Sequence, residues 1–163
     1  MEGDPEPEYR RAMGAFATGV TVVTAAHADG RMSGITVNSL TSVSLKPRLL
    51  LWCLGDQSAR YDQFANADVW GVTVLGAAEE AVARRFTRAE TETVLTQEAE
   101  TFDGAPVLRG VGVANFSCAT RDRRVAGDHL IIIGEVTNFR VWSGDVLTFY
   151  RGQYGRLASE GSK

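Results

Sequence analysis

The alternation of apolar and polar positions along this chain predicts short β-strands separated by turns. β-Branched and aromatic residues gather in brief runs, and turn sequences such as Ala28-Asp29-Gly30 and Ser143-Gly144-Asp145 separate them. Runs joined by such turns pair antiparallel, and closure into a barrel removes exposed sheet edges. The pattern therefore favours a mostly antiparallel barrel with strands over 19–26, 31–37, 48–54, 69–75, 111–120, 130–142 and 146–150.

Three short helices are expected at the periphery of this barrel. Residues 9–17 and 78–86 carry apolar side chains at helical spacing. Residues 58–64 begin with Ser58, a residue type that is typical of a helix N-cap. The fold class expected from the pattern is thus mainly β, with peripheral short helices.

The length of 163 residues predicts a single domain. Residues 1–8 are acidic and contain two prolines, so we expect a disordered N-terminal tail. The domain is expected over 9–158, followed by a C-terminal tail over 159–163. Residues 87–104 are polar, and two interpretations are open for this excursion: a lid over a binding site, or a disordered segment.

Composition places the chain among ordinary globular proteins, with 44% hydrophobic and 23% charged residues. The net charge of −3 offers no basic surface for nucleic acid. No apolar run reaches the roughly 18–20 residues that span a bilayer, and the acidic start is unlike a signal peptide. Together with only two cysteines, Cys53 and Cys118, these features predict a cytoplasmic protein without a membrane partner.

Several kinds of catalytic centre are not expected from this sequence. Phosphate-binding GxxxxGK[ST] and zinc-binding HExxH motifs are absent, and His27 and His129 have no ligand cluster at metal spacing, so no metal is predicted. Asp128 and His129 are neighbours at the start of a predicted strand, where consecutive side chains point to opposite faces. An Asp–His relay is therefore not expected from this pair.

A concentration of hydroxyl and amide side chains suits a redox cofactor. A bound flavin supplies hydride chemistry while the protein binds, orients and shields it, and hydroxyls and main-chain amides suit its ring edge and ribityl chain. A polar edge strand with turn hydroxyls is the structural alternative. The residues concerned are Ser33, Thr36, Asn38, Ser39, Thr41 and Ser42.

Cationic residues supply candidates for the phosphate and for a nicotinamide. Ser58 and Arg60 suit a phosphate at a helix N-terminus, and Arg84 and Arg85 are further candidates, although a single arginine is more often a solvated surface residue. His129 follows a glycine turn and opens an apolar strand, where an imidazole can hydrogen-bond a nicotinamide carboxamide. The alternative is a histidine satisfied at a strand start.

Three segments together carry a resemblance to a known family. They are Thr18–Thr24, Asn38–Ser44 and Gly127-Asp128-His129 with the apolar strand that follows. In this order and spacing they resemble the short-chain flavin reductases, the reductase components of two-component flavin-dependent monooxygenases. The resemblance implies a six-stranded antiparallel Greek-key split barrel, usually a homodimer. It also implies an enzyme that uses NADH or NADPH to reduce FMN or FAD and passes the reduced flavin to a separate monooxygenase.

The resemblance also assigns roles to individual residues. His129 takes the place of the family's nicotinamide-side histidine and is the candidate catalytic residue, with Tyr150, Arg151 and Tyr154 beside the nicotinamide pocket. The implied flavin-binding residues are Met32, Ser33, Thr36, Val37, Asn38, Ser39, Ser42, Cys53, Leu54, Gly55, Ser58, Ala59, Arg60, Arg85 and Phe86.

Two other functions remain open at this stage. One is a module that holds FMN tightly for electron transfer or partner binding and oxidises little NADH or NADPH. The other is an oxidase-like relative that acts on an organic substrate directly. Neither the choice of flavin nor that of nicotinamide follows from the sequence, although four arginines are candidates for a 2′-phosphate: Arg121, Arg123, Arg124 and Arg151.

Overall fold

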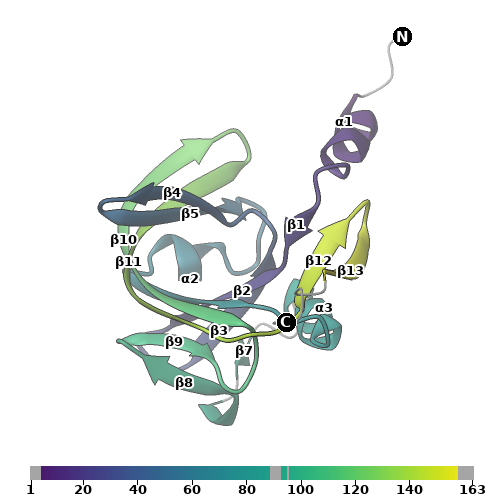
Figure 1. Cartoon of the computed structure of the whole chain (residues 1–163). Helices are drawn as coiled ribbons and strands as arrows, with labels where there is room; N and C mark the ends of the chain where they lie inside the picture. The colour runs from purple at the N-terminus through teal and green to yellow at the C-terminus, as the bar shows by residue number, and fades with distance from the viewer. Residues whose placement is uncertain (1–4, 89–92, 95, 158–163) are drawn as a thin grey trace.

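An antiparallel sheet of eight strands forms the body of the molecule (Figure 1). The structure is a computed structural model that describes residues 5–88, 93–94 and 96–157. The strand order is β4-β5-β11-β10-β6-β2-β3-β7, and every pairing is antiparallel. The strands are β2 (Thr21–Ala26), β3 (Met32–Val37), β4 (Thr41–Leu45), β5 (Arg48–Gly55), β6 (Val69–Val74), β7 (Thr93–Val94), β10 (Ala114–Ala126) and β11 (His129–Val141).

The alternation of side chains decides which face of each strand is buried. In β5, Leu50, Trp52 and Leu54 point into the core while the intervening residues are more exposed. Trp52 meets the rings of Phe64 and Trp70 edge-on, with centroids 5.5 and 6.0 Å apart. This aromatic cluster fills the interior of the curved sheet.

Two smaller sheets complete the fold. β1 (Thr18–Gly19) pairs with β12 (Val146–Tyr150), which pairs in turn with β13 (Gln153–Leu157), and β8 (Ala99–Phe102) pairs with β9 (Ala105–Leu108). The second hairpin lies against the barrel, because Thr24 Oγ1 donates a hydrogen bond to the carbonyl of Pro106 across 2.5 Å.

The helices are short: α1 (Glu6–Met13), α2 (Tyr61–Ala65), α3 (Glu80–Thr87) and one turn of 3-10 helix, η2 (Thr96–Glu98). α3 covers β3 and buries Ala83 and Phe86 in a second core cluster. α1 buries no residue and stands away from the barrel in Figure 1. Within the described part of the chain, no helix is long and apolar enough to cross a membrane.

The expectation of a mainly antiparallel β fold with peripheral short helices is confirmed. Six of the eight strands in the main sheet are six residues or longer, as the six-stranded split barrel implies, and the short strands β4 and β7 flank them. The sequence pattern missed β4 and the strands β7, β8, β9 and β13. These strands are two to five residues long, so they contain too few positions for a clear alternation.

Two helix boundaries differ from those expected. α1 begins at Glu6 instead of residue 9 and ends at Met13, so residues 6–8 are helical and do not belong to a disordered tail. Prolines are tolerated in a first turn and acidic side chains favour it, which explains the earlier start. α2 begins at Tyr61 with Arg60 at its N-cap, so Ser58 is not the cap residue.

The polar excursion is folded where the structure describes it. Residues 93–102 contain β7, η2 and β8, while residues 89–92 and 95 lie outside the described part. Ion pairs of Glu98 with Arg85 and of Glu100 with Arg140 tie this segment to the barrel. The interpretation of residues 87–104 as a disordered segment is therefore wrong for the described portion, because long-range charge pairs and backbone pairing order it.

Candidate functional site

Part of the predicted flavin-binding set lies in one band around the end of β3. Thr36 Oγ1 donates a hydrogen bond to the carbonyl of Ala83 on α3 across 2.8 Å. Beyond β3, Ser39 Oγ accepts a hydrogen bond from the backbone N–H of Cys53 on β5 across 3.0 Å. These contacts bring β3, α3 and β5, which are distant in sequence, to one edge of the barrel. Asn38 is exposed at this edge.

His129 lies beside the end of β5. It opens β11 and pairs in register with Gly55, and a Cβ added to that glycine would lie 3.6 Å from His129 Nε2. The imidazole is 47% exposed. A half-exposed ring above a residue with no side chain is accessible to a ligand.

Asp128 orients this imidazole. Its carboxylate Oδ1 lies 2.8 Å from His129 Nδ1, and this hydrogen bond is the main reason why the pKa of the Asp128 carboxyl lies below its usual range. An ionised carboxylate only accepts hydrogen bonds, so Nδ1 carries the proton and Nε2 faces away toward Gly55. The charge of Arg10 on α1 contributes a smaller lowering of the same pKa.

The expectation that these two side chains point apart is wrong. Asp128 lies in the turn after Gly127, whose φ is +62°, and β11 begins only at His129. The rule that successive side chains alternate applies inside a strand, not in the turn that precedes it. No nucleophile completes a catalytic triad among the hydrogen-bond partners described for this pair.

Arg60 has an internal role in this structure. Its buried guanidinium donates hydrogen bonds to the carbonyls of Gly34, Phe86 and Arg88, which joins the start of α2 to β3 and to the end of α3. Ser58 Oγ accepts the N–H of Arg60 across 3.2 Å, so the loop before α2 is also fixed. α2 has only five residues, so its dipole is a weak source of anion binding.

Arg85 is a second candidate phosphate ligand and is half-buried. Its guanidinium forms a two-point ion pair with the carboxylate of Glu98 and lies over the ring of Phe86, 4.8 Å from the centroid. The hydrogen bond to Glu98 is the main cause that raises the pKa of Arg85. Phe86 itself is buried below Gly34, where an added Cβ would touch its ring, so its side chain serves the core.

The remaining predicted residues are spread along the same strands. Ser33 is buried at the other end of β3, beside Met32, and its Oγ lies 2.7 Å from Nε2 of His27. Leu54 is buried in the core and offers only its main chain, whereas Ser42 and Ala59 are exposed. Val37 accepts a hydrogen bond from Thr21 through its carbonyl.

Cys53 is half-buried at the end of β5. Burial raises the pKa of its thiol, and the hydrogen bond with Ser39 opposes that rise. The thiol is therefore protonated at neutral pH and is not an activated nucleophile.

The β12–β13 hairpin places the predicted nicotinamide residues in two positions. Tyr154 packs edge-on against Phe149 and lines a cavity of about 140 Å³ with Thr36 and Asn38. Burial raises the pKa of the Tyr154 hydroxyl. Arg151 lies at the hairpin turn with φ +49°, and its N–H donates to the carbonyl of Gly14. Tyr154 is thus near the flavin-site residues, whereas Arg151 lies at the end of α1 and its guanidinium lies over the ring of Tyr150.

A cleft of about 850 Å³ lies between the segment that follows β3, the β12–β13 hairpin and α1. Asn38, Ser39 and Thr41 line one side, Phe149 and Gly152 of the hairpin line another, and α1 forms a wall. The volume is in the range of known cofactor sites. The helical spacing predicted over 9–17 puts Met13, Phe16 and Ala17 on one face, but it did not predict that all three line a cleft.

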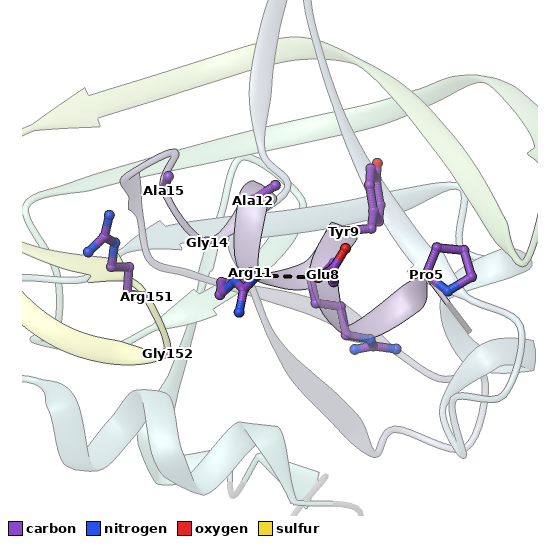
Figure 2. A pocket seen from close by; sticks show the side chains of 10 residues that line it. Pro5, Glu8, Tyr9, Arg11, Ala12, Gly14, Ala15, Arg151 and Gly152 are labelled. Atoms are coloured by element: carbon purple, nitrogen blue, oxygen red, sulfur yellow. Dashed lines mark ion pairs between the residues drawn. The ribbon is translucent and has the colours of Figure 1, made fainter. Parts of the chain in front are cut away.

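α1 is bordered by a second cavity on another side (Figure 2). This cavity measures about 880 Å³. In Figure 2, Arg151 lies beside Gly14 and Ala15, while Tyr9 and Pro5 lie at the far end. The exposed fractions of Tyr9, Met13 and Phe16 are 65%, 52% and 72%, so the helix leaves large apolar side chains uncovered by its own chain.

The family model described as "Flavin reductase like domain" matches residues 13–158. Among curated proteins, the chain is 39% identical to the NADH-dependent FMN reductase SmoA of Agrobacterium fabrum, over 97% of this chain and 90% of the relative. It is also 39% identical to the reductase component of the flavin-dependent trigonelline monooxygenase of Acinetobacter baylyi, over 90% of this chain but 47% of the relative.

Solved structures give the same result. The chain is similar to the NADH:FAD oxidoreductase SgcE6 of Streptomyces globisporus in complex with NAD and FAD fragments, with a TM-score of 0.87 and 34% identity over 99% of both chains. It is also similar to the flavin reductase PheA2, with a TM-score of 0.85 and 33% identity over 98% of this chain and 100% of that one.

Proposed function

The chain belongs to the flavin reductase like domain family, and from that membership we propose that it is an NADH-dependent flavin reductase. It reduces FMN or FAD and supplies the reduced flavin to a separate monooxygenase. The observation that carries this proposal is the cleft in which Asn38 and Ser39 lie beyond the end of β3, next to β5, whose end pairs with His129 of β11.

The residues present fit a flavin. Asn38, Ser39 and Thr41 line the cleft and suit the ring edge and ribityl chain through hydroxyls and main-chain groups. Gly55 places no side chain beside Nε2 of His129, which suits the approach of a flat ring. A bound flavin accepts a hydride at N5 from C4 of the nicotinamide. The protein then contributes mainly by holding the two reactants in register, which removes much of the entropy cost of their encounter.

His129 is the residue that we assign to the nicotinamide. Asp128 fixes the ring through Nδ1, and Nε2 is left to accept a hydrogen bond from the carboxamide of NADH. Tyr154 closes the site from the β12–β13 hairpin. Arg85 is the proposed phosphate ligand, because its forked guanidinium lies on α3, the helix whose Ala83 carbonyl accepts the hydrogen bond of Thr36.

We also infer that the protein is a homodimer whose partner copy covers α1. The helix buries none of its residues, and cavities border it on two sides. Phe16 lines the cleft that also contains Asn38 and Ser39, so dimerisation would complete the flavin site. Phe16→Ser is therefore expected to shift the protein toward monomer in light scattering and to weaken flavin binding.

The matched control is Val125→Ser on the β10–β11 hairpin, where Val125 is also highly exposed. This variant is expected to keep the oligomeric state. A monomeric wild type would contradict the dimer.

The cytoplasm is the proposed location. Its support is the pair of free cysteines, which fits a reducing compartment.

The experiment that tests the function is NADH and NADPH oxidation by purified protein with added FMN, added FAD or no added flavin. Turnover that depends on free flavin and prefers NADH is expected. A protein that binds FMN but oxidises neither nucleotide would instead be a flavin-binding module, and flavin that co-purifies without release would point the same way.

A further inference from the structure

The guanidinium of Arg85 and the carboxylate of Glu98 form a two-point ion pair. Arg85 Nη1 lies 2.6 Å from Glu98 Oε1, and Nη2 lies 3.0 Å from Oε2. Both side chains are about one-third exposed, at 34% and 33%. A phosphate would use the same two-point geometry on a guanidinium. The carboxylate of Glu98 therefore occupies the position on Arg85 that a phosphate would occupy.

Neighbouring contacts fix both partners. Arg85 Nη2 also donates to the carbonyl of Thr93 across 3.2 Å, and its guanidinium lies over the Phe86 ring. The main chain of Glu98 is held by the N–H of Arg109 across 2.8 Å. Because both ends are anchored, the ion pair is a built feature of the fold and not a chance contact between two mobile side chains.

We propose that Glu98 is an internal competitor for the phosphate of the flavin. Its carboxylate accepts two hydrogen bonds from the guanidinium of Arg85. To bind Arg85, a flavin phosphate must displace at least one of these hydrogen bonds and approach the negative charge of Glu98. Glu98 thereby sets how tightly phosphate-bearing flavins are held. The inference rests on the proposed function, which makes Arg85 a phosphate ligand.

A weaker affinity for the flavin phosphate suits a protein that releases its reduced flavin. Differences in affinity between related complexes appear mostly in the dissociation rate. Riboflavin has no phosphate, so neither Arg85 nor Glu98 is expected to change its affinity. The ratio of FMN affinity to riboflavin affinity therefore isolates the effect of Glu98 from any general change in the site.

The test is Glu98→Gln, assayed for the KM of FMN and of riboflavin at saturating NADH and for flavin binding by fluorescence titration. The KM and Kd of FMN are expected to fall roughly three- to tenfold, with riboflavin unchanged. Glu98→Asp keeps the charge, but its side chain is one methylene shorter and reaches Arg85 less well, so it is expected to raise the affinity for FMN by a smaller factor.

Glu100→Gln is the matched control. Glu100 lies two residues away on β8 and forms an ion pair of similar burial with Arg140. This variant is expected to leave the FMN-to-riboflavin ratio unchanged. Thermal unfolding of both variants separates a local effect from a loss of fold.

Two results would overturn the proposal. A weaker affinity for FMN alone in Glu98→Gln would show that Glu98 orients Arg85 toward the phosphate. Equal changes in the affinities for FMN and riboflavin would show that Glu98 has a structural role only. If the wild type oxidised no NADH, the proposed function would fail, but the titration of FMN against riboflavin would still decide the role of Glu98.

Discussion

The carboxylate of Asp128 lies 2.8 Å from Nδ1 of His129, although the two residues are adjacent in the chain. The Gly127 turn makes this contact possible, because it places Asp128 outside the strand that His129 begins. A hydrogen bond of this kind fixes both the tautomer and the direction of an imidazole. Nε2 is therefore the nitrogen that remains for a substrate.

His129→Ala is expected to raise the KM for NADH about tenfold while leaving FMN binding unchanged, because the variant removes one hydrogen bond to the nicotinamide side. Steady-state kinetics with varied NADH and a separate FMN titration measure the two effects. An equal loss of both affinities would contradict the assignment of His129 to the nicotinamide.

Asp128→Asn is expected to lower kcat/KM for NADH severalfold, since an amide holds the imidazole less firmly than a carboxylate. The pKa of Asp128 is lowered by His129. Its carboxylate therefore stays ionised, and the pairing persists, down to a pH below the ordinary range of an aspartate. Protonation of this carboxylate is therefore not expected to contribute to the pH dependence of wild-type kcat/KM above about pH 5.

A kcat/KM for Asp128→Asn equal to that of the wild type would show that the charge of Asp128 does not orient the ring.

Gly71→Ala is expected to destabilise the protein by more than about 2 kcal/mol. A Cβ at this buried position on β6 would collide with the main-chain carbonyl of Pro106 on β9, which cannot move aside without shifting its hairpin. Urea unfolding measures the change. Gly19→Ala is the control, because no atom lies within 4 Å of an added Cβ there, and its stability is expected to match the wild type.

Thiol labelling is expected to modify Cys53 before Cys118. Burial raises the pKa of Cys118 to about 12 and also raises that of Cys53, which is only half-buried. Since the thiolate is the reactive form, a labelling reagent at pH 8 is expected to react slowly with Cys53 and hardly at all with native Cys118. FMN is expected to slow the reaction of Cys53, as judged by mass spectrometry of the labelled peptides. Protection of neither thiol by FMN would place the flavin away from β5.

Much of the fold could be predicted because strand periodicity is local. The apolar run over 48–54 predicts a strand that matches β5, and the turn at Ala28-Asp29-Gly30 joins β2 and β3 as expected. The short strands β8 and β9 could not be predicted in this way, because they are held by contacts such as Thr24 to Pro106 that join distant parts of the chain.

The assignment of individual residues to the flavin site stays a prediction, whereas the contacts among those residues are visible only in the structure. Ser39 and Cys53, for example, are joined by a hydrogen bond. Arg60, expected beside a phosphate, instead donates to three main-chain carbonyls. The partner of a charged side chain depends on which strands lie side by side, and periodicity does not contain that information.

The sequence by itself determined the antiparallel β class, the approximate strand positions and the family resemblance, because each depends on residue types at short spacing. Only the tertiary structure decided that Asp128 turns toward His129, that Glu98 engages Arg85 and that α1 stands apart with its apolar face uncovered. These relationships depend on backbone direction at a turn and on contacts between distant segments, which hydrophobic packing of the whole chain sets.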